Sequence, residues 1–179
     1  SVVEELRRTV KELLDEIKRR DDRLLKEVEE VAREVERKDD ELRKKVEEIL
    51  RRIKELRDRG RVDKRDIDRI VEELRRISEE HKKEVERLKD DIRRRSREHE
   101  KEVRRLLEEA KEVLKRAKEE NRVDDRVLKE LKELMDEAKK NSERVNKKVE
   151  DLLRRLDESS RRVNEEIEKR LTELLKAVE

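Results

Sequence analysis

The residues of this chain that could do chemistry include two histidines, His81 and His99, which stand eighteen positions apart. Eighteen residues are five turns of an ideal α-helix, so both rings point in the same direction. The same interval separates further pairs of identical polar residues, namely Asp21 and Asp39, Ser78 and Ser96, Ser142 and Ser160, and Asn146 and Asn164. All lie within or at the edge of a long apolar pattern, so the sequence predicts a buried polar arrangement that is written twice.

Aspartate, histidine and serine are the residues of a hydrolytic triad, so catalysis is the first chemistry to consider. A triad also needs an exposed nucleophile, an oxyanion hole and a substrate cleft. A closed helical core offers none of these, because its backbone N–H groups are bonded within the helices. The chain also has no aromatic residue, although aromatic side chains usually line small-molecule pockets. We therefore expect no catalytic residue, no enzymatic activity and no cofactor.

Metal binding and titration are the other chemistries open to these side chains. Each copy of the repeated polar arrangement offers one histidine and one aspartate. Zinc takes three or four protein ligands, so we expect no metal site. Histidine titrates near neutral pH. Burial would disfavour the imidazolium, whereas the facing carboxylate would favour it, and the sequence leaves the balance open. A pH response of the two buried histidines therefore stays as an alternative.

Two short connectors divide the chain into three helical segments. The connectors, Gly60-Arg61-Val62-Asp63 and Asn121-Arg122-Val123-Asp124, share one pattern. Glycine and asparagine tolerate the left-handed conformation that follows a helix end, and aspartate is a good N-cap for the next helix. The sequence therefore predicts helices at about 2–58, 64–120 and 125–179, with loops at about 59–63 and 121–124.

Leucine, valine and isoleucine form one apolar stripe along each predicted helix. The stripe returns to the same face after every five turns of 3.6 residues each, which is the period of a straight helix and needs no supercoil. Short connectors force consecutive helices to lie antiparallel. The predicted fold class is all-α: an antiparallel, up-down-up bundle of three long, nearly straight helices that forms a single domain over residues 1–179.

The antiparallel arrangement places the polar residues at matching depths. Asp21 and His99 are equally far along the chain from Gly60, and so are Asp39 and His81. In the same way, each histidine and one asparagine are equally far from the second connector. We expect one layer of Asp21, His99, Ser142 and Asn146, with Ser96 close by, and a second of Asp39, His81, Ser160 and Asn164, with Ser78 close by. A buried polar group without a partner costs about 1–3 kcal/mol, so such layers would penalise helices that slip out of register.

Composition argues against several classes of partner. Charged residues make up 61% of the chain, yet 56 basic residues face 54 acidic ones, so no excess of charge marks a nucleic-acid or anionic-membrane surface. No stretch resembles a membrane span or a signal peptide, so we expect a soluble chain without a targeting signal, compatible with cytoplasmic expression. The absence of cysteine excludes disulfides and thiol chemistry, and it leaves the compartment unknown.

The regular spacing of the polar pairs, the reused connector and the regular caps resemble computationally designed helical bundles. More specifically, the chain is similar to parametric three-helix bundles that carry buried hydrogen-bond networks, and the resemblance covers the whole sequence. It implies high thermal stability and no natural substrate. Spectrin-like repeats also use three long helices but typically carry a core tryptophan, and BAR domains present a basic face. This sequence has neither feature.

Two classes of function follow. The first is a self-contained scaffold or rigid rod, monomeric and without a required partner. The second is an interaction module that forms a homo-oligomer or a larger bundle with partner helices. The leucines at the edge of the stripe distinguish the two classes. In a scaffold they pack into the three-helix core, whereas in an interaction module they remain exposed for a partner helix. They are Leu14, Leu25, Leu50, Leu107, Leu128, Leu153 and Leu175. The width of the stripe favours a closed core and a monomer.

Overall fold

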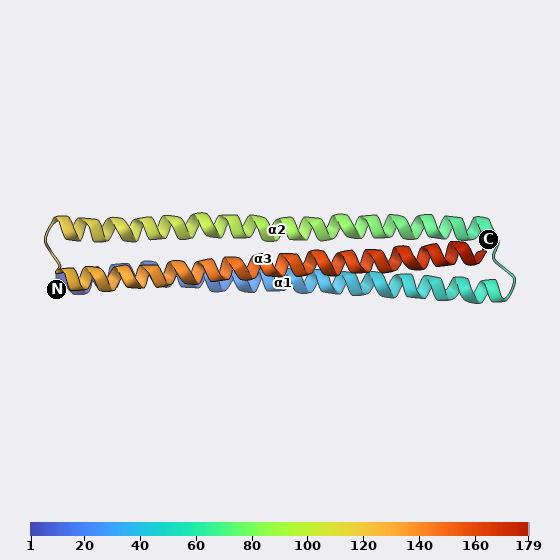
Figure 1. Ribbon diagram of the computed structural model, residues 1–179, viewed down its shortest axis with the longest axis horizontal. Coiled ribbons are helices and arrows are strands. Elements are labelled where there is room, and N and C mark those ends of the chain that lie inside the picture. Colours follow the sequence, from blue (N-terminus) through green and yellow to red (C-terminus); the bar gives the residue numbers. More distant parts are fainter. Residues whose placement is uncertain (179) are drawn as a thin grey trace. The chain divides into compact units, whose positions relative to one another are not determined.

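The computed structural model describes residues 1–178, which form three long α-helices that pack against one another. They are α1 (Val2–Asp58), α2 (Lys64–Glu119) and α3 (Asp125–Val178), in the chain order drawn in Figure 1. The all-α class with three long helices is thereby confirmed. The observed bounds fall within one residue of the expected ones, and the expected last residue, 179, lies outside the described part.

The connectors cap the end of α1, both ends of α2 and the start of α3. Gly60 and Asn121 have φ angles of 69° and 51°, the left-handed conformation expected after a helix end. The backbone N–H of Gly60 donates to the carbonyl of Arg57 at 2.9 Å, which gives a carbonyl in the last turn of α1 a hydrogen-bond partner. The carboxylates of Asp63 and Asp124 accept hydrogen bonds from backbone N–H groups three residues later, at 3.0 and 3.1 Å. The reused connector is therefore one capping solution used twice.

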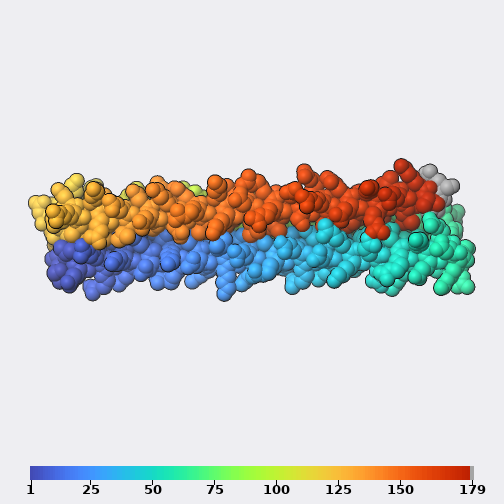
Figure 2. Space-filling model, turned by 60° about the horizontal axis from the view of Figure 1, so that its bottom comes forward, coloured from blue at the N-terminus to red at the C-terminus, as the bar shows by residue number. Residues whose placement is uncertain are grey.

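Contacts divide the chain into two compact units, each containing part of all three helices. Unit 1 consists of Ser1–Glu29 and Asp91–Asp151, and unit 2 consists of Glu30–Asp90 and residues 152–178. The single continuous domain expected from the sequence stays a prediction. In each unit α1 and α3 are neighbours, as Figure 2 shows, and side-chain pairs such as Arg7–Glu130 and Arg43–Glu166 connect them.

The direction of the helices within unit 1 follows from which residues meet. Leu6 of α1 shares a core cluster with Ala117 of α2, whereas Asp21, further along α1, contacts His99, earlier in α2. The two helices therefore run in opposite directions. In unit 2 the pairing of Asp39 with His81 and the shared cluster of Ile53 and Ile67 give the same result.

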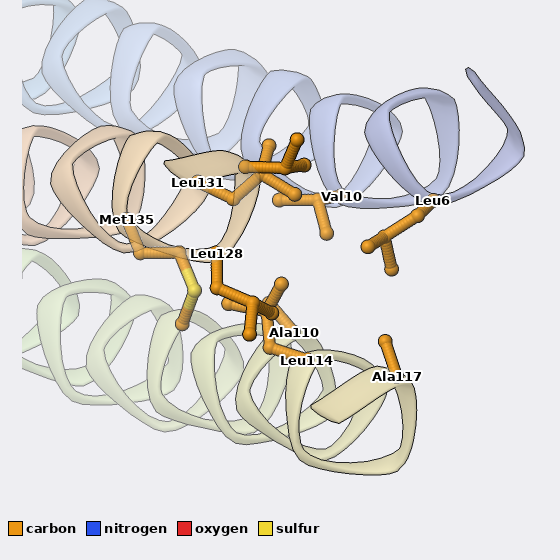
Figure 3. Packing of buried hydrophobic residues seen from close by; sticks show 9 residues of the cluster. Leu6, Val10, Ala110, Leu114, Ala117, Leu128, Leu131 and Met135 are labelled. Carbon is orange, nitrogen blue, oxygen red and sulfur yellow. The ribbon is translucent and has the colours of Figure 1, made fainter. Parts of the chain in front are cut away.

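The core of each unit is aliphatic. In unit 1, side chains from all three helices converge, and Figure 3 shows Leu6 and Val10 of α1 facing the α2 and α3 members of the cluster. In unit 2, a comparable cluster includes Leu74 and Leu171, both fully buried. With no aromatic ring to fill space, many branched aliphatic contacts hold the helices together, and the polar layers interrupt this otherwise uniform packing.

Candidate functional site

The polar layer of unit 1 is centred on the carboxylate of Asp21, which is fully buried. His99 Nε2 lies 2.7 Å from Asp21 Oδ1, and the Ser142 hydroxyl lies 2.8 and 3.0 Å from the two carboxylate oxygens. The Asn141 amide donates to Asp21 Oδ2 at 3.0 Å. One carboxylate of α1 therefore accepts hydrogen bonds from α2 and from two adjacent residues of α3.

Two residues expected in this layer do not bond to Asp21. Ser96 and Asn146 are half-buried, and Asn146 Oδ1 is a buried atom without a hydrogen-bond partner. Asn141, which the sequence analysis did not select, takes part instead. Asn141 could have been identified from its position next to Ser142, because adjacent residues at the edge of the stripe can both reach the same carboxylate of α1.

The polar layer of unit 2 contains the corresponding residues but is bonded less completely. His81 Nε2 lies 2.8 Å from Asp39 Oδ1, yet the atoms do not meet hydrogen-bond geometry. Ser159, which the sequence analysis also missed, donates to Asp39 Oδ2 at a long 3.4 Å. The hydroxyl of Ser160 is buried without a partner. The same residue pattern thus yields aligned hydrogen bonds in one unit and an under-bonded carboxylate in the other.

The two remaining members of the unit 2 layer bond to each other. Ser78 is buried, and its hydroxyl donates to Asn164 Oδ1 at 3.2 Å, which joins α2 to α3. Their counterparts five helical turns away are Ser96 and Asn146, for which no such bond forms. Each unit therefore uses a different subset of the expected residues.

The geometry of Asp21 is not that of a charge-relay triad. In a triad the imidazole lies between the hydroxyl and the carboxylate, so that it can take the serine proton. Here the carboxylate lies between Ser142 and His99 and accepts from both. Because a carboxylate only accepts, His99 Nε2 carries the proton, and the buried Nδ1 is left without a partner. The Ser142 hydroxyl donates to the carboxylate and not to the imidazole, so the arrangement lacks the serine–histidine hydrogen bond of a triad.

Within residues 1–178, no three His, Cys, Asp or Glu side chains gather in a group that could hold a metal ion. None of the helices in this part of the chain has an apolar stretch that could cross a membrane.

Two cations stand at apolar positions of the α2 stripe. Lys89 is buried, and its ammonium group pairs with Asp157 and, at 2.7 Å, with Glu86. Burial alone would lower the pKa of Lys89, but the hydrogen bonds to the two carboxylates outweigh it and raise the pKa above its ordinary value. Lys89 was not among the residues expected in the polar layers. The apolar residues five turns before and after it, Val71 and Leu107, are the signal that it replaces a core residue.

The second cation, Arg95, is half-buried at the edge of the stripe. Its guanidinium donates to Glu27 of α1 at 2.7 Å and to Asp91 of its own helix at 3.1 Å. The bonds to Glu27 and Asp91 raise the pKa of Arg95. Arg95 therefore ties α2 to α1 within unit 1 rather than contributing apolar surface.

A solved structure similar to this chain is also a bundle of three helices. A solved structure described as a "Computationally designed three helix bundle" is similar to this chain, with a TM-score of 0.52 and 19% sequence identity. The alignment covers 99% of this chain and 87% of that one. No protein family model matches the sequence, and no curated protein matches it either. The fold is that of a three-helix bundle, with buried polar interactions set into its core.

Proposed function

We propose that the chain is a designed structural scaffold without a natural substrate, in which the two polar layers hold the helices in one register. The observation that carries this proposal is the buried Asp21 carboxylate, which accepts hydrogen bonds from both α2 and α3. The regular spacing of the polar pairs, the designed origin of the similar structure and the absence of a matching natural family support a designed origin.

An aliphatic core alone discriminates weakly between registers, because leucine, valine and isoleucine tolerate one another's positions at modest cost. A shift of one helix by a single turn moves its side chains about 5.4 Å along the axis, beyond the reach of a hydrogen bond. A hydrogen bond to a charged group contributes roughly 1.5–3 kcal/mol. The layers therefore add a penalty to slipped registers that the apolar stripe does not provide.

The single methionine of the chain gives a direct test. Met135 lies in the core cluster of unit 1, so its methyl group gives one NMR signal for each distinct packing of that core. The test variant removes both layers by placing leucine at both aspartates and both histidines and alanine at Ser142 and Ser160. We expect this variant to keep its helix content and to show several Met135 signals.

Two matched controls contain only half of these substitutions, in unit 1 or in unit 2. Because each helix then keeps one layer, we expect one Met135 signal from each control. A single sharp signal from the variant without either layer would refute the role in register. Loss of helix content in both controls would show instead that the layers are needed for folding.

The burial of the edge leucines supports a closed core and a monomer. Leu128 is buried, and the other six leucines that distinguish a closed core from an open groove are half-buried. Among residues 1–177, the large apolar side chains that are exposed are Val2 and Leu56. Light scattering after size exclusion should give a mass of 22.0 kDa. A multiple of that mass would favour the interaction module instead.

A further inference from the structure

One surface groove of unit 1 departs from the charge balance of the chain. It lies between α2 and α3, has a volume of about 500 Å³, and is lined by four lysines and one acidic residue, Asp136. The lysines are Lys111, Lys115, Lys118 and Lys132. Since the whole sequence has 56 basic and 54 acidic residues, an excess of three positive charges in one groove is a local feature.

Four other grooves of similar size show that this excess is particular to one place. In each of them the numbers of acidic and basic residues differ by at most one. The groove that reaches His99, for example, is lined by four arginines and three glutamates. Among residues 1–178, Lys115, Lys118 and Lys132 form no salt bridge, whereas Lys111 pairs with Glu108 at 3.5 Å. Three of the four lysines of the groove therefore have no carboxylate of the described residues within salt-bridge distance.

The floor of this groove is apolar. Leu114 of α2 and Leu128 and Met135 of α3 line it, and all three belong to the core cluster of unit 1. Figure 3 shows Leu128 and Met135 directed from α3 toward α2, where Leu114 lies. Because these three side chains are only 4–6% exposed, a ligand in the groove would meet their edges and the hydrocarbon stems of the lysines, with ammonium groups at the rim.

We propose that this groove binds a single-chain organic anion, with a sulfate or carboxylate head and a short alkyl tail. The head would be held by the lysine ammonium groups, and the tail would lie on the lysine stems and the exposed edges of the leucine and methionine side chains. Lys111, Lys115 and Lys118 are spaced by four and three residues, so they share one face of α2 and extend over about 10 Å. That length suits a short alkyl chain lying along the helix.

Octyl sulfate, used below its micelle concentration, is the probe for this site. Met135 is the only methionine and lines the groove, so its labelled methyl group reports occupancy without interference from other signals. We expect a saturable shift of the Met135 signal that weakens as salt is added, because the attraction between exposed charges is screened. Replacing Lys115 and Lys132 by glutamine should weaken binding by roughly tenfold, which lies within the range expected for two exposed ion pairs.

The control variant replaces Lys45 and Lys54, two exposed lysines of unit 2, by glutamine and so has the same net charge. It should bind octyl sulfate as the unsubstituted chain does. Equal binding by both variants would overturn the proposal, as would an equal shift with octyltrimethylammonium, which has the same tail and the opposite charge. The same shift with inorganic sulfate would exclude the apolar floor and overturn it too. Circular dichroism during each titration ensures that the chain remains helical.

Discussion

Replacing Asp21 by leucine tests whether the first polar layer acts as a unit. The substitution removes the acceptor that serves His99, Ser142 and Asn141. Asn141 is half-buried and can turn toward solvent, but the imidazole of His99 is buried and keeps an N–H donor without a partner. Breaking a buried pair by removing one member typically costs about 3–5 kcal/mol, and the leucine offsets part of this through added apolar burial. We therefore expect the free energy of unfolding to fall by about 2–4 kcal/mol.

A second variant separates the loss of partners from the loss of the carboxylate itself. When His99 is also replaced by leucine and Ser142 by alanine, no buried donor is left behind. Exchanging a whole buried polar group for apolar residues is often neutral or stabilising, so this triple variant should recover most of the stability lost by Asp21→Leu. Guanidinium unfolding followed by circular dichroism measures both variants.

The opposite ranking would refute the reasoning. If Asp21→Leu costs less than about 1 kcal/mol, the hydrogen bonds to the carboxylate contribute little net stability beyond the cost of burying its charge. If the triple variant is less stable than Asp21→Leu, the losses add up and the residues do not act as one network.

Four further changes follow from the same geometry. Asp39→Leu should cost about 1 kcal/mol less than the matching change in unit 1, because its hydrogen bonds are long or misaligned; equal unfolding midpoints would contradict this. Ser160→Ala should leave stability unchanged or raise it, because it removes a buried hydroxyl that has no partner; thermal unfolding against the same substitution at its unit 1 counterpart is the comparison. Gly60→Ala should cost about 1 kcal/mol in chemical denaturation, because its φ of 69° is left-handed although no atom lies near the added Cβ; a stabilising effect would be inconsistent with that conformation. Finally, because the pKa of Lys89 is raised, its pairing stabilises the fold below the ordinary pKa of 10.5, and this stabilisation is lost as the pH rises through the folded-state pKa. The unfolding midpoint of Lys89→Met should therefore fall less steeply above about pH 10 than that of the unsubstituted chain. An equal fall in both proteins would count against the assignment.

Local features of the fold follow closely from the sequence because their causes are local. A left-handed Gly60 or Asn121 followed by an aspartate N-cap needs only neighbouring residues, and the observed φ angles and cap bonds agree with the expectation. The pairing of each aspartate with a histidine also follows, because it depends only on the connector position and the rise per residue. Both pairs are found at 2.7 and 2.8 Å.

Which oxygen or nitrogen completes each layer does not follow from periodicity. Asn141 and Ser159 occupy equivalent positions five helical turns apart, but their types differ, so a search for identical residues passes over them. Their roles depend on side-chain length: the Asn141 amide reaches its carboxylate at 3.0 Å, whereas the shorter Ser159 hydroxyl remains at 3.4 Å. Ser96 and Asn146 do not bond to each other although Ser78 and Asn164 do, and the identical eighteen-residue spacing holds no information on that difference.

The distribution of donors and acceptors gives each helix a chemical identity. In both units α1 contributes the carboxylate, α2 the imidazole, and α3 a serine hydroxyl that donates to the carboxylate. Two copies of α1 packed side by side would place carboxylate against carboxylate, and two copies of α2 would bring imidazoles together without an acceptor. A mixture of the three helices as separate peptides should therefore select one of each kind, because self-pairing leaves like charges or unmatched donors in the core.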